Sequence, residues 1–446
     1  MSYSIIAAEL HKALQDQDTA LVETLASELN PADLAQVGHH EPASRMAVLL
    51  HCVPLDKRAA TLGFLEPQEQ LAATAGMPVS ELAELVAHMS ADERVDYFKQ
   101  LDRERQQTLL KALPPTVRDD LLKLARHAEG TAGAIMTSAF MAIPAYYSVA
   151  RAMQTLRLKG ADVETIYQVY CIDTSGRFLG TVSLREIILA SSETQLAELM
   201  TEEVIWVGID TLQEEVARLI ARYDLLALPV LEDERLVGII TYDDAMDVAE
   251  EEATEDMHKG MSIGKLEGGL RSASLFDLYR KRIVWLVLLV FANIFSGAGI
   301  AYFEETIEAY IALVFFLPLL VDSGGNAGSQ AATLMVRGMA TGDVRSRDWA
   351  KLLGREVFVA AGLGLTMALA VSVVGIFRAG TEIAMVVAMS MVLIVIVGSL
   401  IGMILPFILN RLGWDPATAS APLVTSIADA SGVLIYFAIA TAVLGL

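Results

Sequence analysis

The stretch that decides the fold is ATASAPLVTSIADASGVLIYFAIATAVL, residues 417–444, near the carboxyl terminus. It is apolar or small throughout except for one acid, Asp429. A helix needs about 20 such residues to cross a hydrocarbon core roughly 30 Å thick. Similar runs precede it, and we predict five membrane-spanning helices, at 283–303, 309–335, 356–377, 383–409 and 417–444.

Lysine and arginine are distributed unequally between the loops. Three bases, 280–282, precede the first span and five more lie between the second and third spans, whereas 304–308 holds three acids and no base. Cytoplasmic loops retain basic residues. We therefore predict a multi-pass protein of the cell inner membrane with a cytosolic amino terminus and, after five spans, an extracytoplasmic carboxyl terminus. The polar first 30 residues do not read as a cleavable signal.

The net charge of −22 lies almost entirely before the membrane half, because 44 of the 55 acids and 23 of the 33 bases precede residue 272. An acidic surface repels nucleic acid and attracts cations, so we expect no nucleic-acid partner. The chain has two cysteines, too few for a disulfide framework or a cysteine metal site. All seven histidines precede the first span and no nucleophile and base pair stands out, so we do not expect an enzyme.

Residues 1–130 are predicted to form short amphipathic helices that begin at recurring capping phrases. These are Asn30-Pro31, Glu66-Pro67, Ser90 and Pro114-Pro115. Proline is favoured at the first helical position and Ser, Asn or Asp at the cap before it. The last three phrases recur at intervals of about 24 residues, which is typical of a small α-solenoid.

Residues 131–249 form an internal repeat of strand, glycine, strand and helix. Met136-Thr137 recurs as Met200-Thr201, and the run 178–183 recurs as 235–241. Two such units resemble a tandem pair of cystathionine-β-synthase (CBS) domains with an α/β fold.

In CBS domains a hydroxyl and an acid three residues later often hold the ribose of an adenine nucleotide. Thr241 and Asp244 match that pattern, while the first copy has Ser183 followed by Glu186. The resemblance thus implies ATP at the CBS pair. The same residues also fit helix caps, with a hydroxyl at the start and an acid in the first turn.

An acidic strip of eight carboxylates without a lysine or arginine lies between Asp243 and Asp256. Asp243, Asp247, Glu251 and Glu255 recur every four residues and so share one helical face, where like charges cost about 0.2–0.5 kcal/mol per pair. A hard divalent ion would compensate them, since Mg²⁺ and Ca²⁺ prefer oxygen ligands. A solvated acidic helix is the alternative.

Polar residues inside the spans mark two further places. In 322–330, Asp322, Asn326 and Gln330 accompany glycines spaced for close helix packing, and a second such glycine pair follows at 398 and 402. In the last span, an unpaired carboxylate at bilayer depth would cost about 2.5–3.5 kcal/mol. Asp429 therefore indicates a cation site, or else a group hydrogen-bonded to Asn326 or a serine.

One acid per chain cannot dehydrate Mg²⁺, which gives up its waters reluctantly. Two copies related by a two-fold axis could hold the hydrated ion through its waters. This favours a homodimer with a central pore, because symmetric pairs are the commonest assembly.

Two long runs of the membrane half resemble the MgtE family of magnesium channels. They are PLLVDSGGNAGSQAATLMVRGMATGDV, 318–344, and DPATASAPLVTSIADASGVLIYF, 415–437. The order of parts is also similar: a helical domain at 1–130, a CBS pair at 131–249, a connecting "plug" helix at 250–279 and a five-helix all-α transmembrane bundle at 280–446.

The resemblance implies a homodimeric Mg²⁺ channel whose pore metal site we place at Asp429 with Thr425, Ala428 and Asn326. It also implies that cytosolic Mg²⁺ bridges the helical domain, the CBS pair and the plug, and closes the pore. The expected regulatory acids are Asp92, Asp96, Asp224, Asp243, Asp244, Asp247, Glu251, Glu255 and Asp256.

Two rival hypotheses remain open. A secondary transporter of Mg²⁺, Co²⁺ or Mn²⁺ would also use a protonatable Asp429. A membrane-anchored nucleotide sensor would use its spans only to dimerise, and Asp429 would then not affect Mg²⁺ flux.

Overall fold

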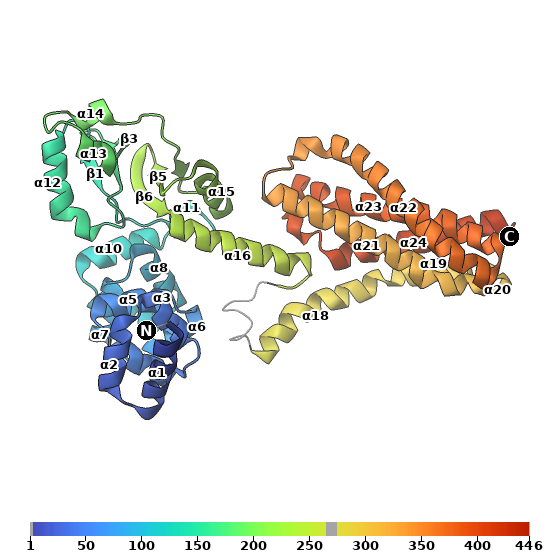
Figure 1. The fold of residues 1–446 in the computed structure, drawn as a ribbon, viewed down its shortest axis with the longest axis horizontal. Coiled ribbons are helices and arrows are strands. Elements are labelled where there is room, and N and C mark those ends of the chain that lie inside the picture. Colours follow the sequence, from blue (N-terminus) through green and yellow to red (C-terminus); the bar gives the residue numbers. More distant parts are fainter. Residues whose placement is uncertain (1–2, 265–273, 446) are drawn as a thin grey trace. The chain divides into compact units, whose positions relative to one another are not determined.

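The computed structural model describes residues 3–264 and 274–445. The chain divides into two compact units, Met1–Glu250 and Glu251–Leu446, each described here by itself. The first unit contains helices and two small sheets, and the second contains long helices (Figure 1).

The first unit begins with a helical solenoid. From α2 onward each helix packs against the helix two places further on, as α3 does against α5, α5 against α7 and α6 against α8. The predicted helix starts are confirmed: the Asn30 side chain accepts a hydrogen bond of 2.8 Å from the Asp33 N–H, and Pro67 and Pro115 lie in first turns. The helices are α1 Tyr3–Asp16, α2 Thr19–Glu28, α3 Pro31–Gly38, α4 Ala43–His51, α5 Leu55–Gly63, α6 Pro67–Thr74, α7 Val79–Ala87, α8 Ala91–Gln100, α9 Arg103–Ala112 and α10 Pro115–Leu124.

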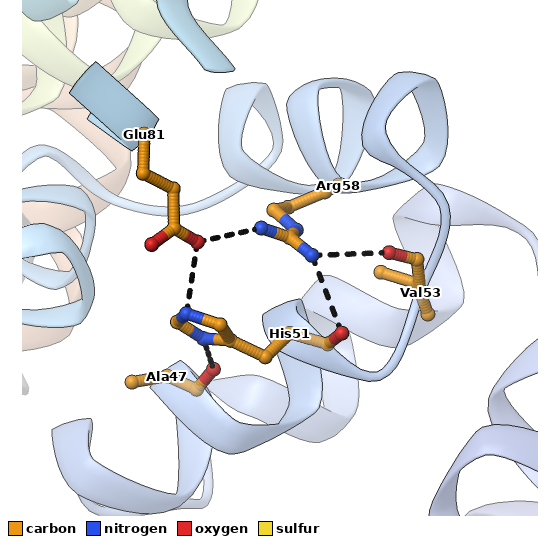
Figure 2. Close-up of polar contacts among 5 residues, drawn as sticks. All are labelled: Ala47, His51, Val53, Arg58 and Glu81. Atoms are coloured by element: carbon orange, nitrogen blue, oxygen red, sulfur yellow. Dashed lines mark hydrogen bonds and ion pairs between the residues drawn. The ribbon is translucent and has the colours of Figure 1, made fainter. Parts of the chain in front are cut away.

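Glu81 of α7 contacts side chains of two other solenoid helices, α4 and α5 (Figure 2). Its Oε1 lies 2.9 Å from both the Arg58 guanidinium of α5 and Nε2 of His51 in α4. Arg58 also donates to the carbonyl of His51 at 3.2 Å, at the end of α4. The solenoid is thus stabilised by a partly buried polar network as well as by its leucine core.

The remainder of the first unit contains two three-stranded sheets of the same design, ordered β1-β2-β3 and β4-β5-β6. In each, the first pair is parallel and the second antiparallel. The strands are β1 Ala142–Pro144, β2 Gln168–Ile172, β3 Phe178–Ser183, β4 Val207–Gly208, β5 Ala227–Glu232 and β6 Arg235–Thr241; the helices are α11 Ala132–Ile135, α12 Val149–Lys159, η1 Gly160–Asp162, α13 Leu184–Leu189, α14 Leu196–Leu199, α15 Gln213–Tyr223 and the start of α16, Tyr242–Gly260.

The repeated Met-Thr phrases link the two sheets reciprocally. Thr137 of the first copy pairs with Ile239 of β6, and Thr201 of the second copy pairs with Thr181 of β3. The repeated glycines make room for them, since a Cβ at Gly180 would lie 2.4 Å from the Thr201 carbonyl oxygen. The internal repeat read from the sequence is therefore a pseudo-symmetric pair of α/β units.

The second unit is helical. Its long helices pack side by side, α23 lying against α21, α22 and α24 (Figure 1). It comprises the end of α16, then α18 Leu275–Ala292, α19 Ile294–Tyr302, α20 Glu304–Ala309, α21 Ala312–Ala340, η2 Ser346–Asp348, α22 Trp349–Ala379, α23 Thr381–Arg411, η3 Pro416–Thr418 and α24 Ala421–Leu444.

Four segments of the described chain are long and apolar enough to cross a membrane: Leu275–Tyr302, Trp349–Ala379, Thr381–Arg411 and Ala421–Leu444. The remaining predicted span corresponds to α21, a 29-residue helix. Its polar run from Asp322 to Gln330 lowers its mean hydropathy, so composition alone does not identify α21 as a membrane-spanning helix. Helix α16 crosses the predicted domain boundary at 249 without a break. Part of the predicted plug, 265–273, lies outside the described residues.

The two predicted glycine pairs pack against each other. A Cβ at Gly398 would lie 2.2 Å from the Gly324 carbonyl oxygen, and one at Gly402 would lie 1.9 Å from that of Gly328. Helices α21 and α23 are therefore in backbone contact over one turn, which only glycine allows.

Candidate cation sites

Helix α24 carries Asp429 two turns after its amino-terminal cap, Ser420. One oxygen of the carboxylate, Oδ1, is buried and has no hydrogen-bond partner among the described residues. The alternative in which Asn326 or a serine satisfies this oxygen is therefore not what the structure contains. A buried carboxylate oxygen without a donor is unfavourable unless a cation or water completes it.

Helix α21 approaches Asp429 of α24 closely at Gly325, which has no side chain. A Cβ added there would lie 3.4 Å from Asp429 Oδ1 and 2.8 Å from the Thr425 methyl group. Thr425, one turn before Asp429, donates to the Ala421 carbonyl at 2.8 Å, and its hydroxyl lies 3.2 Å from that of Ser329. Hydroxyls and a carboxylate thus share the contact between α21 and α24.

The other predicted pore residues have different environments. Asn326 is exposed, and its amide donates at 2.9 Å to Asp322, one turn earlier on α21. Ala428 is buried within α24. Asp322, Asn326 and Gln330 form an exposed polar stripe at four-residue spacing. On a helix of a membrane bundle, such a stripe faces water or another chain.

A second group of acids lies in the first unit. Asp92 of α8 acts electrostatically on Asp244, and Asp243 acts on Asp92, so carboxylates of the solenoid and of α16 lie near one another. Two acids that the sequence did not single out join them: Glu93, next to Asp92, and Glu164, which follows η1. We call these five residues the acidic cluster.

Burial is the main influence on this cluster, and mutual repulsion adds to it. Burial first and then the Asp92 charge raise the pKa of Asp244 to about 7, against an opposing hydrogen bond from Thr241. Burial and Asp92 likewise raise the pKa of Glu93 to about 7. Burial first and then the Asp243 charge raise the pKa of Asp92, and burial together with Asp92 and Asp243 raises that of Glu164. Ionising these carboxyls is therefore unfavourable in the fold, because burial and mutual repulsion both oppose it.

The basic residue nearest to the cluster in sequence is already engaged. Arg94 donates to the carbonyls of Val86 and Met89 at 3.0 and 2.7 Å, and it lies 3.7 Å from Asp120. The donors of the cluster are carboxylates, which suit a hard divalent cation. No three Asp, Glu, His or Cys side chains of the described chain converge tightly enough to enclose an ion directly.

The acidic strip continues into the second unit, where a lysine compensates it. Lys259 Nζ lies 2.6 Å from Glu255, one turn earlier on α16, and 2.6 Å from Asp415, just before η3. Burial would lower the pKa of Lys259, but its two carboxylate partners together raise it. Burial and Asp415 raise the pKa of Asp256. This end of the strip thus has an internal cation already in place.

The remaining predicted regulatory acids are more exposed. Asp96 acts on Glu93 from the next turn of α8, and the pKa of Asp247 is raised by partial burial and by Asp243. Glu251 is exposed on α16. Asp224 is exposed and ends α15 in a left-handed conformation, with φ of 51°.

Both predicted nucleotide pairs form helix caps. The Ser183 hydroxyl donates to Glu186 at 2.7 Å and accepts from its N–H at 3.2 Å, at the start of α13. The Thr241 hydroxyl donates to Asp244 at the start of α16. Asp244 therefore belongs at once to a cap, to the acidic cluster and to the predicted nucleotide site.

The sequence did not reveal four of these charged residues, because their partners are distant along the chain. Lys259 and Asp415 are 156 positions apart. Glu93 differs, since it adjoins Asp92 in a helix start and this position is readable from the sequence. Glu164 has no such signal, because it is an isolated acid in a connection between elements.

Three family models match the chain. One described as a divalent cation transporter matches residues 317–439, one described as the MgtE intracellular N domain matches 29–130, and the CBS domain matches 132–193 and 196–251. These ranges contain the membrane helices with Asp429, the solenoid and the two α/β units.

Similar proteins extend over the whole chain. The magnesium transporter MgtE of Thermus thermophilus is 38% identical over 440 residues, covering 98% of both chains. That of Bacillus subtilis is 32% identical over 444 residues, covering 99% of this chain and 98% of the relative.

Two solved structures resemble the first unit. One is the soluble part of a magnesium transporter, 31% identical with a TM-score of 0.53, covering 56% of this chain and all of the other. The second is the cytosolic domain of the Mg²⁺ channel MgtE in complex with ATP, 37% identical with a TM-score of 0.52, covering 54% and 99%.

Proposed function

The chain belongs to the MgtE family of divalent cation transporters, and from that premise we propose that it is a Mg²⁺ channel, working as a homodimer, that closes when cytosolic Mg²⁺ is plentiful. The observation that carries the proposal is the buried and unpartnered Asp429 Oδ1 between two helices of the membrane half. The bases in the loop between α21 and α22 favour a cytosolic amino terminus.

The pore proposal rests on what one carboxylate can do. Asp322, the other acid near Asp429, repels its charge and cannot neutralise it. A cation would offset the repulsion between the two carboxylates and would also interact with the oxygen that lacks a hydrogen-bond donor. Because a single acid cannot strip Mg²⁺ of water, a second copy of Asp429 would complete the site around a hydrated ion. Thr425 and the exposed face of α21 that carries Asn326 would line the pore and contact the water shell of the ion.

The gating proposal rests on uncompensated charge in the acidic cluster. Its carboxylates repel one another where solenoid and CBS elements meet α16, so a divalent cation would stabilise this arrangement and its absence would loosen it. Asp92, Asp243 and Asp244 are the residues that would hold the ion. Asp96, Asp224, Asp247, Glu251, Glu255 and Asp256 are proposed as additional regulatory positions.

We extend the proposal to ATP at the CBS pair, because a relative of known structure contains it. The ribose would interact with Thr241 and Asp244, and Ser183 and Glu186 would form the equivalent position of the first copy. Since Asp244 also belongs to the acidic cluster, nucleotide and Mg²⁺ binding would be coupled through this side chain.

Recordings from the full chain in planar bilayers test the proposal. We expect unitary Mg²⁺ currents that disappear as Mg²⁺ on the cytosolic side reaches millimolar levels. Neutralising Asp244, Asp247 and Glu255 together should leave the channel open at that concentration, because one residue that would hold the closing ion and two of the additional regulatory acids have lost their charge.

Two results would contradict parts of this account. Slow flux without unitary steps, accompanied by proton movement, would indicate the secondary transporter instead. Normal closure of the triple variant would show that these acids are not the sensor. Asp119→Asn is a suitable control, because this exposed acid of α10 lies outside the cluster.

A further inference from the structure

A cavity of about 620 Å³ lies at one end of the membrane unit, where η2 and the first turn of α22 meet the last turns of α23. Arg347 and Arg411 contribute the charge in its lining, and Trp349 stands beside them. Ile404, Phe407 and Ile408 of α23 form an apolar wall. None of its lining residues belongs to the Asp429 site or to the acidic cluster, and the proposed conduction and gating do not involve them.

The polar end of this cavity suits an anion. Its described lining contains two guanidinium groups and no acid. Asp348, between the two lining residues of η2 and α22, accepts a hydrogen bond of 3.0 Å from the Arg345 backbone N–H. The cavity also adjoins the amino terminus of α22, where the helix dipole favours negative charge. Guanidinium pairs bind phosphate oxygens through several donors at once.

The other wall suits an acyl chain. Ile404, Phe407 and Ile408 recur at three- and four-residue spacing, so they lie on one face of α23. That face continues along α23, one of the segments long and apolar enough to span a membrane. Trp349 is 52% exposed and Ile408 is 48% exposed. Tryptophan is favoured at the level of lipid headgroups.

We propose that this cavity binds an anionic phospholipid, with its phosphate between Arg347 and Arg411 and an acyl chain along Ile404, Phe407 and Ile408. A free phosphate would leave the apolar wall in contact with water. A phospholipid fills both ends, because its charged headgroup would lie at the arginines while the attached acyl chain would lie against the apolar wall. The proposal depends on the chain lying in a bilayer and not on its conducting Mg²⁺.

Native mass spectrometry of the purified full chain, titrated with phosphatidylglycerol and separately with phosphatidylcholine, tests this assignment. We expect tighter binding of phosphatidylglycerol to the wild type. The double variant Arg347→Gln with Arg411→Gln should bind it about 30-fold more weakly, since two arginines at the headgroup level are lost. Replacing both by lysine should preserve most of the binding, because the charge remains.

Arg378→Gln is a control that removes one arginine charge from the opposite end of α22, where Arg378 stacks over Phe315; the single variants Arg347→Gln and Arg411→Gln are its matched comparison. The Arg378→Gln variant should retain the preference for phosphatidylglycerol. Equal binding of the two lipids, or an unchanged preference in the double glutamine variant, would overturn the proposal. Displacement of phosphatidylglycerol by millimolar inorganic phosphate would assign the cavity to a free anion instead.

Discussion

Single carboxylates account for most of the chemistry of this molecule, and their surroundings give them different tasks. Asp429 lies between two membrane helices with one oxygen unpartnered. Asp244 is buried among other acids, whereas Glu255 has a lysine beside it. Carboxylates are therefore expected to take part in ion conduction, in Mg²⁺ sensing or in a structural ion pair, depending on the positive charge near each of them.

The pH dependence of stability follows from Asp244. Its ordinary pKa is about 3.9, and burial with the Asp92 charge raises it to about 7 in the folded chain. Between these values the folded state binds a proton that the unfolded chain has released, so stability falls as the pH rises towards 7. We expect the unfolding midpoint of the first unit, followed by calorimetry in the full chain without divalent ions, to fall by several degrees from pH 5 to pH 8.

Mg²⁺ should reverse this loss, and more strongly at pH 8 than at pH 5, because the ion requires ionised carboxylates. Asp244→Asn should flatten the pH profile, while the exposed Asp119→Asn should leave it as in the wild type. A midpoint independent of pH in the wild type would contradict the charge state assigned to the acidic cluster.

At the scale of elements, the contact between α21 and α23 depends on glycines that leave no space for a side chain. Gly402→Val would place a Cβ 1.9 Å from the Gly328 carbonyl oxygen. Overpacking of this kind costs about 1–3 kcal/mol or more. We expect a markedly lower thermal midpoint of the membrane unit, measured in detergent, and loss of Mg²⁺ flux.

Gly362→Val provides the comparison, since a Cβ on that glycine of α22 meets nothing within 4 Å. It should fold and conduct as the wild type does. Equal tolerance of the two valines would show that the backbone contact between α21 and α23 does not matter for stability.

The end of α16 is a second element whose role depends on a single contact. Lys259 occupies the space between Glu255 and Asp415 that a divalent cation would otherwise take. Lys259→Gln removes this positive charge from beside Glu255, Asp256 and Asp415. We expect the Mg²⁺ concentration that half-closes the channel to fall about threefold to tenfold, given the modest energy of exposed ion pairs.

This threshold is measurable as open probability against cytosolic Mg²⁺ in bilayer recordings. Lys123→Gln removes an equal charge from α10 and should leave the threshold unchanged. A higher threshold in Lys259→Gln would indicate that the lysine assists closure rather than competing with the ion.

At the scale of the whole molecule, local patterns predicted the elements well. Apolar runs of membrane length marked the spans, the prolines at 31, 67 and 115 marked helix starts, and the repeated glycines marked the contacts that need them. Each of these features is encoded within a few residues, so it is readable without the fold.

Contacts between distant segments were the part that local patterns could not predict. Glu164 joins the acidic cluster, and Lys259 reaches Asp415, only because the chain folds back on itself. Asn326 was predicted beside Asp429 on a correct neighbouring helix, yet its amide donates to Asp322 instead. Helix proximity was thus foreseeable, while side-chain direction was not.

The central claim is that Mg²⁺ crosses the membrane past the Asp429 carboxylate. The most direct measurement is the rate of Mg²⁺ entry into proteoliposomes that contain an internal Mg²⁺ indicator, compared for the wild type, Asp429→Asn and Asp343→Asn. Asp429→Asn preserves the shape of the side chain and removes its charge. Asp343→Asn makes the same change in the loop after α21. The account predicts that Asp429→Asn abolishes Mg²⁺ entry while Asp343→Asn retains it; wild-type entry through Asp429→Asn would contradict it.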